Sequence, residues 1–320
     1  MLRRRFWILG SVGLWSTQIL AQASPCVNAI ENGVLKETRR LETQYRRMTK
    51  GRDGIKHDNA GRFKRGTRPH QAILLLHGFI SSPFEVDPLA RQFQQNGFTT
   101  YEPLLPGFGS SSEVANHSSL VEWQESVRSN LRLLTECYDE VTLVGFSLGG
   151  ALAMDFALSN DPDDLNLQKD VARLALISPL VKPTVKLGAT LNNFLRVFTR
   201  LVSLKDLYNL SHNPDLQVPM SFPKFYNDRI PLNAVAQTLK LSRRLQGLPR
   251  HETRAIETYL SVSEMDETVD WKKSVSFVQT HFPAMHLRHF DADENIPHQL
   301  PLSPAARTLG KDLRNFVQSL

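Results

Sequence analysis

A serine flanked by glycines is the feature of this sequence most suited to covalent chemistry. Ser147 lies in Gly145-Phe146-Ser147-Leu148-Gly149, after the apolar run Val141–Val144 and before the helical pattern ALAMDFALSN. A serine on a sharp turn between a strand and a helix needs neighbours with almost no side chain, because larger ones would clash. Such a turn exposes the hydroxyl and points the following backbone N–H groups at the atom under attack. The pattern therefore indicates a serine nucleophile.

The stretch around Ser147 resembles the nucleophile elbow, G-x-S-x-G, of the α/β-hydrolases. In that family the serine, the acid and the histidine follow in this order, each just beyond the carboxyl end of a strand. The resemblance covers about residues 70–320 and rests on HGF, GFSLGG, DETV and His298, which look most like bacterial carboxylesterases and monoacylglycerol lipases. It implies an α/β-hydrolase fold, with a mostly parallel central sheet flanked by helices and a helical cap insertion.

The acid that this resemblance implies is Asp266. It follows the expected strand Thr258–Ser263, and the sequence DETV that begins at Asp266 is similar to the family's turn after its seventh strand. Glu264 and Asp270 lie on the same loop and remain alternatives. A solvated loop carboxylate without a catalytic role is the alternative interpretation for each of the three.

The histidine that fits the family order is His298. It lies in the loop between the last expected strand, Met285–Phe290, and the closing helix. The other candidates, His281, His286 and His289, lie before or within that strand. The family often has glycine or serine just before the histidine, whereas this chain has Ile296-Pro297, which leaves the register of the loop open.

The resemblance also implies an oxyanion hole. His77-Gly78-Phe79 follows the continuous apolar run of Gln71–Leu76, which is typical of a strand buried on both faces. In the family this turn supplies the backbone N–H of the residue after the glycine, here Phe79, and the residue after the serine, Leu148, supplies the second donor. Together these groups imply acyl transfer, in which Asp266 orients His298 and His298 takes the proton of Ser147.

Alternating strands and helices surround these residues, which favours one α/β domain in this 320-residue chain. Strands are expected at 98–105 and 171–177, and helices at 27–50, 84–96, 120–138 and 304–320, with a loop or weak strands at 50–70. The alternation stops between 181 and 248, where we expect the cap to line an acyl site. The domain core is then 70–180 and 249–320, preceded by a basic helical and loop segment, 24–69.

Residues 1–23 have the layout of a secretory signal peptide. Arg3–Arg5 are followed by the mostly apolar stretch Phe6–Leu20 and by a small-x-small site that ends at Ala23. An uncleaved membrane anchor is the alternative. The pattern predicts an exported protein, periplasmic or secreted by a bacterium. In such an oxidising compartment Cys26 and Cys137, the two cysteines of the chain, could pair, or both could remain free thiols.

The net charge of +6 is unevenly distributed. Residues 1–70 carry 15 Lys/Arg against 5 Asp/Glu, so the remaining chain is net negative, which gives little support for nucleic-acid binding. Residues 27–69 could contact anionic lipid or envelope polymer, although a solvated helix face explains the same charges. No dinucleotide or phosphate-binding motif and no metal-ligand spacing is present, so neither cofactor nor metal is expected.

Hydrolysis of carboxylic esters is the function these features favour, with short or medium acyl esters or monoglycerides as substrates. The alternatives are an aminopeptidase or thioesterase on the same fold, and a non-catalytic envelope binding protein on a degenerate hydrolase fold. The intact set of Ser147, Asp266 and His298 argues against the last, while fold alone does not fix the substrate.

Overall fold

A seven-stranded sheet forms the centre of the computed structural model, which describes residues 15–184 and 230–318. The strand order is β1-β3-β2-β4-β5-β6-β7, and all neighbours are parallel except β1 and β3. The strands are β1 (Arg62–Lys64), β2 (Gln71–Leu76), β3 (Thr99–Glu102), β4 (Glu140–Phe146), β5 (Val171–Ile177), β6 (Glu257–Ser263) and β7 (Met285–Phe290). The expected mostly parallel α/β-hydrolase sheet is therefore confirmed.

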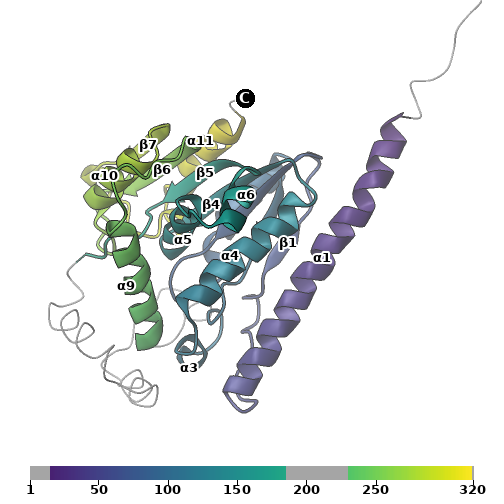
Figure 1. The fold of residues 1–320 in the computed structure, drawn as a ribbon, viewed down its shortest axis with the longest axis horizontal. Coiled ribbons are helices and arrows are strands. Elements are labelled where there is room, and N and C mark those ends of the chain that lie inside the picture. The colour runs from purple at the N-terminus through teal and green to yellow at the C-terminus, as the bar shows by residue number, and fades with distance from the viewer. Residues whose placement is uncertain (1–14, 185–229, 319–320) are drawn as a thin grey trace, which may run out of the picture.

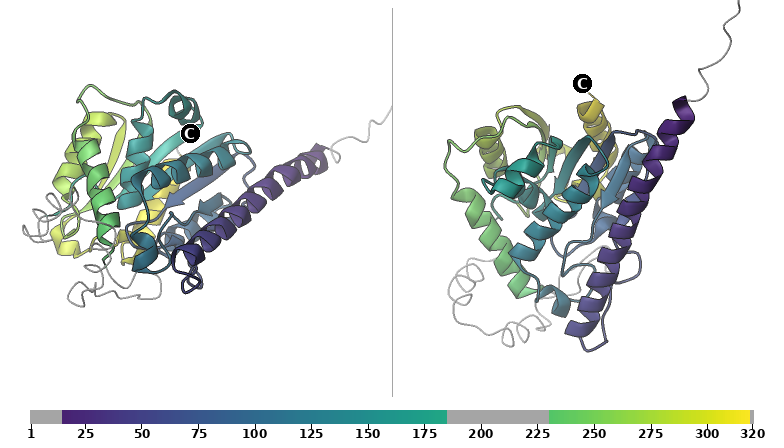
Figure 2. Two further views of the ribbon diagram at one scale, coloured as in Figure 1. Left: turned by 60° about the horizontal axis from the view of Figure 1, so that its bottom comes forward. Right: turned by 45° about the vertical axis from the view of Figure 1, so that its right-hand side comes forward.

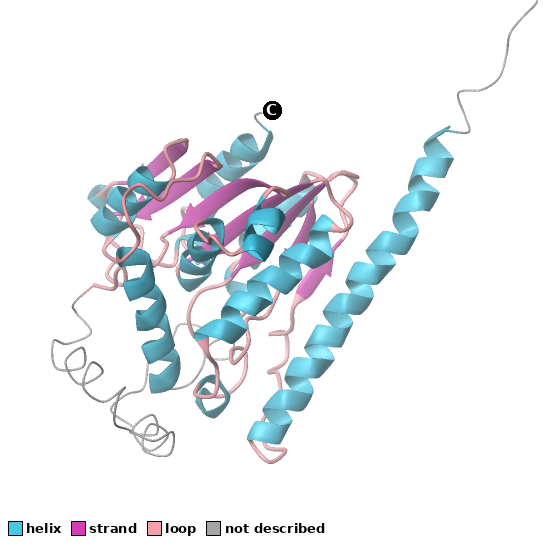
Figure 3. Cartoon of the chain, viewed as in Figure 1, coloured by secondary structure: helices cyan, strands magenta, loops and turns pink. Residues whose placement is uncertain are grey.

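Helices cover both faces of the sheet (Figures 1 and 3). The α-helices are α1 (Trp15–Met48), α2 (Asp87–Gln95), α3 (Ser112–Ala115), α4 (Leu120–Thr135), α5 (Leu148–Ala157), α6 (Pro162–Gln168), α9 (Leu232–Gln246), α10 (Trp271–His281) and α11 (Ala306–Gln318). The short 3₁₀ turns are η1 (Pro83–Glu85), η3 (Ala292–Glu294) and η4 (Leu300–Leu302).

Two apolar clusters divide these helices between the faces of the sheet. Leu89 and Phe93 of α2 and Leu309 and Leu313 of α11 pack on one face. Side chains of α1, α4, α5, α6, α9 and α10 share the other cluster, on the opposite face, and Figure 2 shows these helices from two further sides. The central strands are thus buried on both sides, which explains the largely apolar sequences of β2, β4 and β5.

The expected elements agree with the structure except at some boundaries. The strand expected at 98–105 is shorter, since Pro103 follows Glu102 and has no N–H for the ladder. The helix expected at 120–138 ends at Thr135. The helix α6 was not expected, although Asp161 caps it and Pro162 occupies its first turn, both of which are sequence signals for a helix start.

The predicted cap, 181–248, is described only in part. Residues 185–229 lie outside the described residues, while α9 forms most of the described remainder and packs against α4 and α5. The domain boundaries proposed from the sequence therefore stay predictions.

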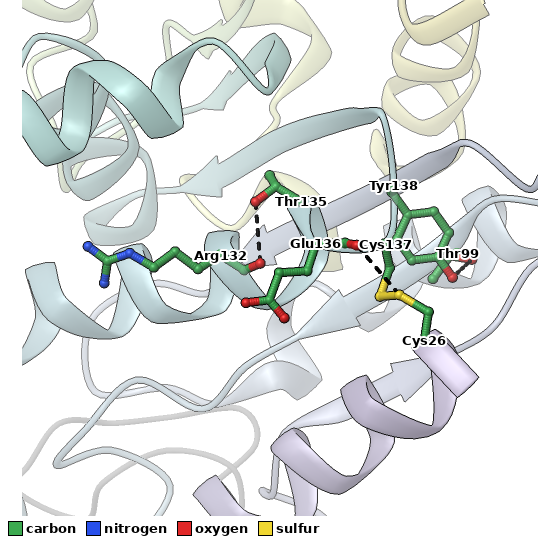
Figure 4. Close-up of a disulfide and its surroundings, with 7 residues drawn as sticks. All are labelled: Cys26, Thr99, Arg132, Thr135, Glu136, Cys137 and Tyr138. Carbon is green, nitrogen blue, oxygen red and sulfur yellow. Dashed lines mark hydrogen bonds between the residues drawn. A yellow bond between two sulfur atoms is a disulfide. The ribbon is translucent and has the colours of Figure 1, made fainter. Parts of the chain in front are cut away.

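The N-terminal helix α1 is joined to the domain by a disulfide (Figure 4). Cys26 of α1 pairs with Cys137, just beyond α4, with a Cα–Cα distance of 5.8 Å. The pairing that the sequence left open is thus present. Residues 1–14 of the predicted signal peptide lie outside the described residues, and α1 includes the predicted cleavage position at Ala23. Within the described ranges, no helix has both the length and the apolar character needed to cross a membrane.

Candidate active site

Ser147 lies on a strained turn between β4 and α5. Its backbone angles are φ 51° and ψ −112°, outside the regions that non-glycine residues normally adopt. The flanking glycines allow a close approach: a Cβ on Gly145 would lie 2.4 Å from Gly149 O, and one on Gly149 would lie 2.4 Å from Leu76 O. The spacing of the glycines is therefore required by the crossing of β2, β4 and α5.

The three residues that the sequence placed in one site lie in hydrogen-bonding contact. His298 Nε2 is 3.0 Å from Ser147 Oγ, and His298 Nδ1 is 2.6 Å from Asp266 Oδ2. All three residues are buried, and the Phe146 ring packs on the imidazole at a centroid distance of 5.1 Å. The contacts join residues separated by 32 and 151 positions in the sequence. The geometry is that of a nucleophile, a base and an acid that orients the base.

Asp266 is fixed by more than the histidine. Its Oδ1 accepts hydrogen bonds from the backbone N–H groups of Thr268 (2.8 Å) and Val269 (2.9 Å), and its side chain has no exposed area. The rival carboxylates have other partners: Asp270 caps α10 by accepting from Lys273 N, and Glu264 accepts from Ala292 N. Among the three candidates, only Asp266 reaches His298.

The remaining histidines of the C-terminal half lie elsewhere. His281 is buried against Glu252 O, His286 is exposed beside Glu257, and His289 lies between Glu264 and Asp291. Ile296 and Pro297, which stand where the family often has glycine or serine, leave His298 within reach of Ser147 and Asp266. Ser263 Oγ donates to Ile296 O and holds this loop at the end of β6.

The predicted oxyanion donors lie at the ends of β2 and β4. Phe79 is the third residue after β2, and Leu148 begins α5 directly after Ser147. Neither backbone N–H donates to a backbone carbonyl in the turns and loops of the described residues. The Phe79 turn is held by Glu85, whose buried carboxylate accepts from Gly78 N at 2.7 Å. Glu85 was not recognised from the sequence, because a lone glutamate after a proline carries no signal of such a role.

His77 is a structural neighbour of this turn. Burial lowers the pKa of His77 to about 4, so the ring is neutral at pH 7. Its Nδ1–H donates to Gly78 O at 2.8 Å, and its Nε2 accepts from Leu105 N at 3.0 Å. The imidazole therefore joins the two loops: Nδ1 bonds within the loop after β2, and Nε2 bonds to the loop after β3.

Other groups that could hold a ligand lie apart from these residues. Ligand atoms of Glu264, His289 and Asp291 lie within 4.8 Å of one another, but the two carboxylates are exposed and both contact His289. A cavity of about 490 Å³ opens near the beginnings of β5 and β6, at the opposite edge of the sheet from Ser147, and Phe156 and Arg254 line it. Neither feature is part of the catalytic arrangement.

The sequence of the chain is similar to those of known hydrolases. The chain matches the family described as "Serine aminopeptidase, S33" over residues 67–291, a range that contains Ser147 and Asp266 and ends before His298. It is 32% identical over 93 residues to a carboxylesterase of Bacillus subtilis (strain 168), covering 29% of this chain and 37% of that protein. It is 31% identical over 91 residues to a thermostable monoacylglycerol lipase of Bacillus sp. (strain H-257), covering 28% and 36%. The chain thus spans little more than a third of either relative.

Solved structures agree with the fold over most of the chain. The structure reported for the metagenome-derived lipolytic enzymes LipS and LipT superposes with a TM-score of 0.62 at 18% identity, covering 83% of this chain and 100% of that one. A monoacylglycerol lipase of Paleococcus ferrophilus gives a TM-score of 0.58 at 18% identity, covering 80% and 99%. At this identity the likeness establishes the fold.

Proposed function

The chain belongs to the serine aminopeptidase S33 family, and from that premise we propose that it is a serine hydrolase that cleaves carboxylic esters through an acyl-enzyme. The single observation that supports this most strongly is the continuous hydrogen-bonded series Ser147–His298–Asp266. The carboxylesterase and monoacylglycerol lipase relatives favour an ester as the substrate.

The first half-reaction transfers the acyl group to the serine. His298 Nε2 accepts the Ser147 hydroxyl proton as Oγ bonds to the carbonyl carbon, and Asp266 holds the imidazole with Nδ1 protonated. The carbonyl oxygen becomes an oxyanion that the N–H groups of Phe79 and Leu148 stabilise. When the carbon–oxygen bond to the leaving alcohol breaks, His298 returns the proton to that alcohol.

Water completes the second half-reaction. His298 takes a proton from water as the water oxygen attacks the acyl carbon, and the same proton returns to Ser147 Oγ as the ester bond to the enzyme breaks. The products are a carboxylic acid and the regenerated enzyme.

We propose short or medium acyl esters, including monoglycerides, as the substrate class. The proteins named as monoacylglycerol lipases among the relatives and solved structures support this choice. The family description supports a second candidate, an aminopeptidase, because it names a serine aminopeptidase. A thioesterase would use the same nucleophile and base, and a non-catalytic envelope protein would not need the strained Ser147 turn.

We also propose that the protein is exported after cleavage near Ala23. The disulfide Cys26–Cys137 supports an oxidising compartment, since such bonds are rare in the cytosol. Exposed basic side chains of α1, among them Lys36, Arg39 and Arg47, support contact with an anionic envelope surface.

Labelling by a fluorophosphonate probe, followed by an acyl chain-length series of p-nitrophenyl esters, tests the proposed chemistry. Wild-type protein should be labelled and should turn over short or medium esters, and Ser147→Ala should lose labelling and lower kcat by ~10⁴ or more. Aminoacyl p-nitroanilides and acyl thioesters serve as competing substrates. A labelled protein that turns over the p-nitroanilides but no esters would be a peptidase, and one that turns over the thioesters but no esters would be a thioesterase. A folded wild-type protein that resists labelling would exclude a serine hydrolase.

A further inference from the structure

The N-terminal segment reaches the catalytic edge of the sheet through Tyr45. This residue lies in the last turns of α1, is buried, and accepts a hydrogen bond from the backbone N–H of Gly107 at 2.8 Å. Gly107 belongs to the loop after β3 and has φ +87°, and a Cβ there would lie 2.5 Å from the Ser118 side chain. The loop is thus tightly packed at the point where Tyr45 holds it.

Phe108, the next residue of this loop, touches the oxyanion turn. Its ring packs edge-on against Phe79 at 5.7 Å and against His77 at 5.9 Å, and stacks on Trp123 of α4 at 5.4 Å. Phe108 has no exposed area. Because aromatic rings in a close-packed interior have little freedom to move, the position of Phe108 constrains the position of Phe79.

A second contact of the N-terminal segment joins the same two loops. The fully buried Asn59 donates from Nδ2 to Gly109 O at 3.3 Å, and its Oδ1 accepts from Ser82 Oγ at 2.9 Å. Gly109 follows Phe108, and Ser82 lies three residues beyond Phe79. One side chain therefore bridges the loop after β3 and the loop after β2.

Residues that lie between Tyr45 and Asn59 in the sequence form further hydrogen bonds with the loop after β3. Lys56 N donates to Gly109 O at 2.9 Å, Ser110 Oγ donates to Gly54 O at 2.6 Å, and Ser111 Oγ donates to Asp53 Oδ2 at 2.7 Å. In each of these contacts the partner from the N-terminal segment, Asp53, Gly54 or Lys56, precedes residue 67, where the match to the family begins. The contacts are a property of this chain's own N-terminal segment.

We propose that Tyr45 and Asn59 are positioning residues for the oxyanion hole, so that the segment 26–59 is required to place the Phe79 N–H for catalysis. The inference rests on the proposed function in that Phe79 is taken as an oxyanion donor. Neither residue contacts the catalytic side chains in the described structure; each acts through the loop after β3 or directly on the loop after β2.

Amide hydrogen exchange tests the mechanical part of this proposal without any substrate. In Tyr45→Phe, the Gly107 N–H loses its acceptor, and exchange should accelerate in the peptides that cover 77–85 and 105–111, by roughly 10-fold. Tyr138→Phe is the matched control, because it removes a buried hydroxyl that accepts from Thr99 Oγ1 (3.1 Å), near the disulfide (Figure 4). Acceleration confined to 105–111, or equal acceleration at 77–85 in Tyr138→Phe, would overturn the proposal.

Kinetics test the catalytic part. In Tyr45→Phe we expect kcat to fall roughly 10-fold with KM nearly unchanged, and the inhibition constant of a trifluoromethyl ketone, which forms an oxyanion on Ser147, to rise by the same factor. Tyr138→Phe should change neither. Asn59→Ala, which removes both contacts of the bridge, should have the larger effect on kcat.

The outcomes separate this proposal from the proposed function. A wild-type protein without hydrolase activity would refute the proposed function, and the exchange experiment would still decide whether Tyr45 holds the Phe79 turn. An active enzyme whose kcat and ketone affinity are unchanged in Tyr45→Phe would refute the positioning role and leave the proposed function intact. A rise in KM without a fall in kcat in Tyr45→Phe would likewise contradict the positioning role.

Discussion

The catalytic edge and the N-terminal segment differ in how their contacts relate to the sequence. At the catalytic edge, the residues Ser147, Asp266 and His298 each follow a strand of one parallel sheet, and the sheet brings them together. The N-terminal segment contributes no strand until β1 and is fixed largely by individual side-chain contacts, among them those of Cys26, Tyr45 and Asn59. The first region carries the proposed chemistry, and the second holds its surroundings.

From this difference we expect substitutions in the first region to lower kcat and substitutions in the second region to lower the free energy of unfolding. Ser147, Asp266 and His298 are each part of one hydrogen-bonded series, so loss of a member removes the mechanism while most of the packing remains. The disulfide contacts no catalytic group, so its loss should lower the free energy of unfolding and leave the rate nearly unchanged. Three further predictions follow this contrast.

The largest effect is expected for Asp266→Asn. An amide at this position no longer fixes the His298 tautomer that accepts the serine proton, and kcat should fall by ~10⁴. The change in the free energy of unfolding should be much smaller than for core truncations, because the volume is conserved. Steady-state kinetics and urea denaturation measure the two quantities.

Asp270→Asn is the matched control for this substitution. Asp270 lies four residues further on and caps α10, and asparagine caps helices as well as aspartate does. Its kcat should stay within about twofold of wild type. Equal losses in both variants would show that the loop, rather than Asp266 itself, limits the rate.

Removal of the disulfide should affect stability more than rate. The double substitution of Cys26→Ser and Cys137→Ser opens a loop of 111 residues and should lower the free energy of unfolding by about 2–5 kcal/mol. Because Cys26 and Tyr45 are 19 residues apart on α1, about 28 Å along its axis, kcat at 25 °C should change by less than about threefold. Urea denaturation with and without reductant measures the stability.

Reductant supplies the control for the disulfide experiment. Wild-type protein should lose the same stability on reduction, and the double variant should not respond. A variant that keeps its stability but loses most of its kcat would contradict the division between the two regions.

The smallest effect on kcat is expected at Glu102, at the end of β3, whose protonation bears on stability alone. Glu102 is buried, its Oε2 has no partner among the described residues, and it lines a cavity of about 560 Å³ between β1, β3 and α2. Burial, and next the Asp87 carboxylate, raise the pKa of Glu102 to about 8 from 4.5. The folded protein therefore keeps a proton that the unfolded chain releases, and stability should fall as pH rises from about 4.5 to about 8.

Glu102→Gln imitates the protonated acid and should remove this part of the pH dependence. Its Tm should match wild type near pH 5 and exceed it above pH 8, as measured by thermal unfolding across that range. Glu125→Gln, on the exposed side of α4, is the control and should follow wild type. Parallel pH profiles for Glu102→Gln and wild type would show that Glu102 ionises normally.

The sequence by itself determined the local parts of this protein. Strands β2 and β5 and the turn at Ser147 were predicted because each is specified by neighbouring residues: largely apolar stretches fill a buried parallel strand, and glycines permit a crossing that a Cβ would block. The order of serine, acid and histidine predicted Asp266 and His298 as the partners of Ser147, and these side chains lie in hydrogen-bonding contact, since the carboxyl ends of parallel strands meet at one edge.

The contacts between side chains far apart in the sequence are visible in the tertiary structure alone. It paired Cys26 with Cys137, separated Asp266 from Glu264 and Asp270, and placed Tyr45 against the loop that carries Phe108. No local pattern specifies such contacts, because a tyrosine on an amphipathic helix has the same spacing whatever it touches. The candidate catalytic residues could be proposed from short-range order, whereas the contacts around them depend on how the chain packs.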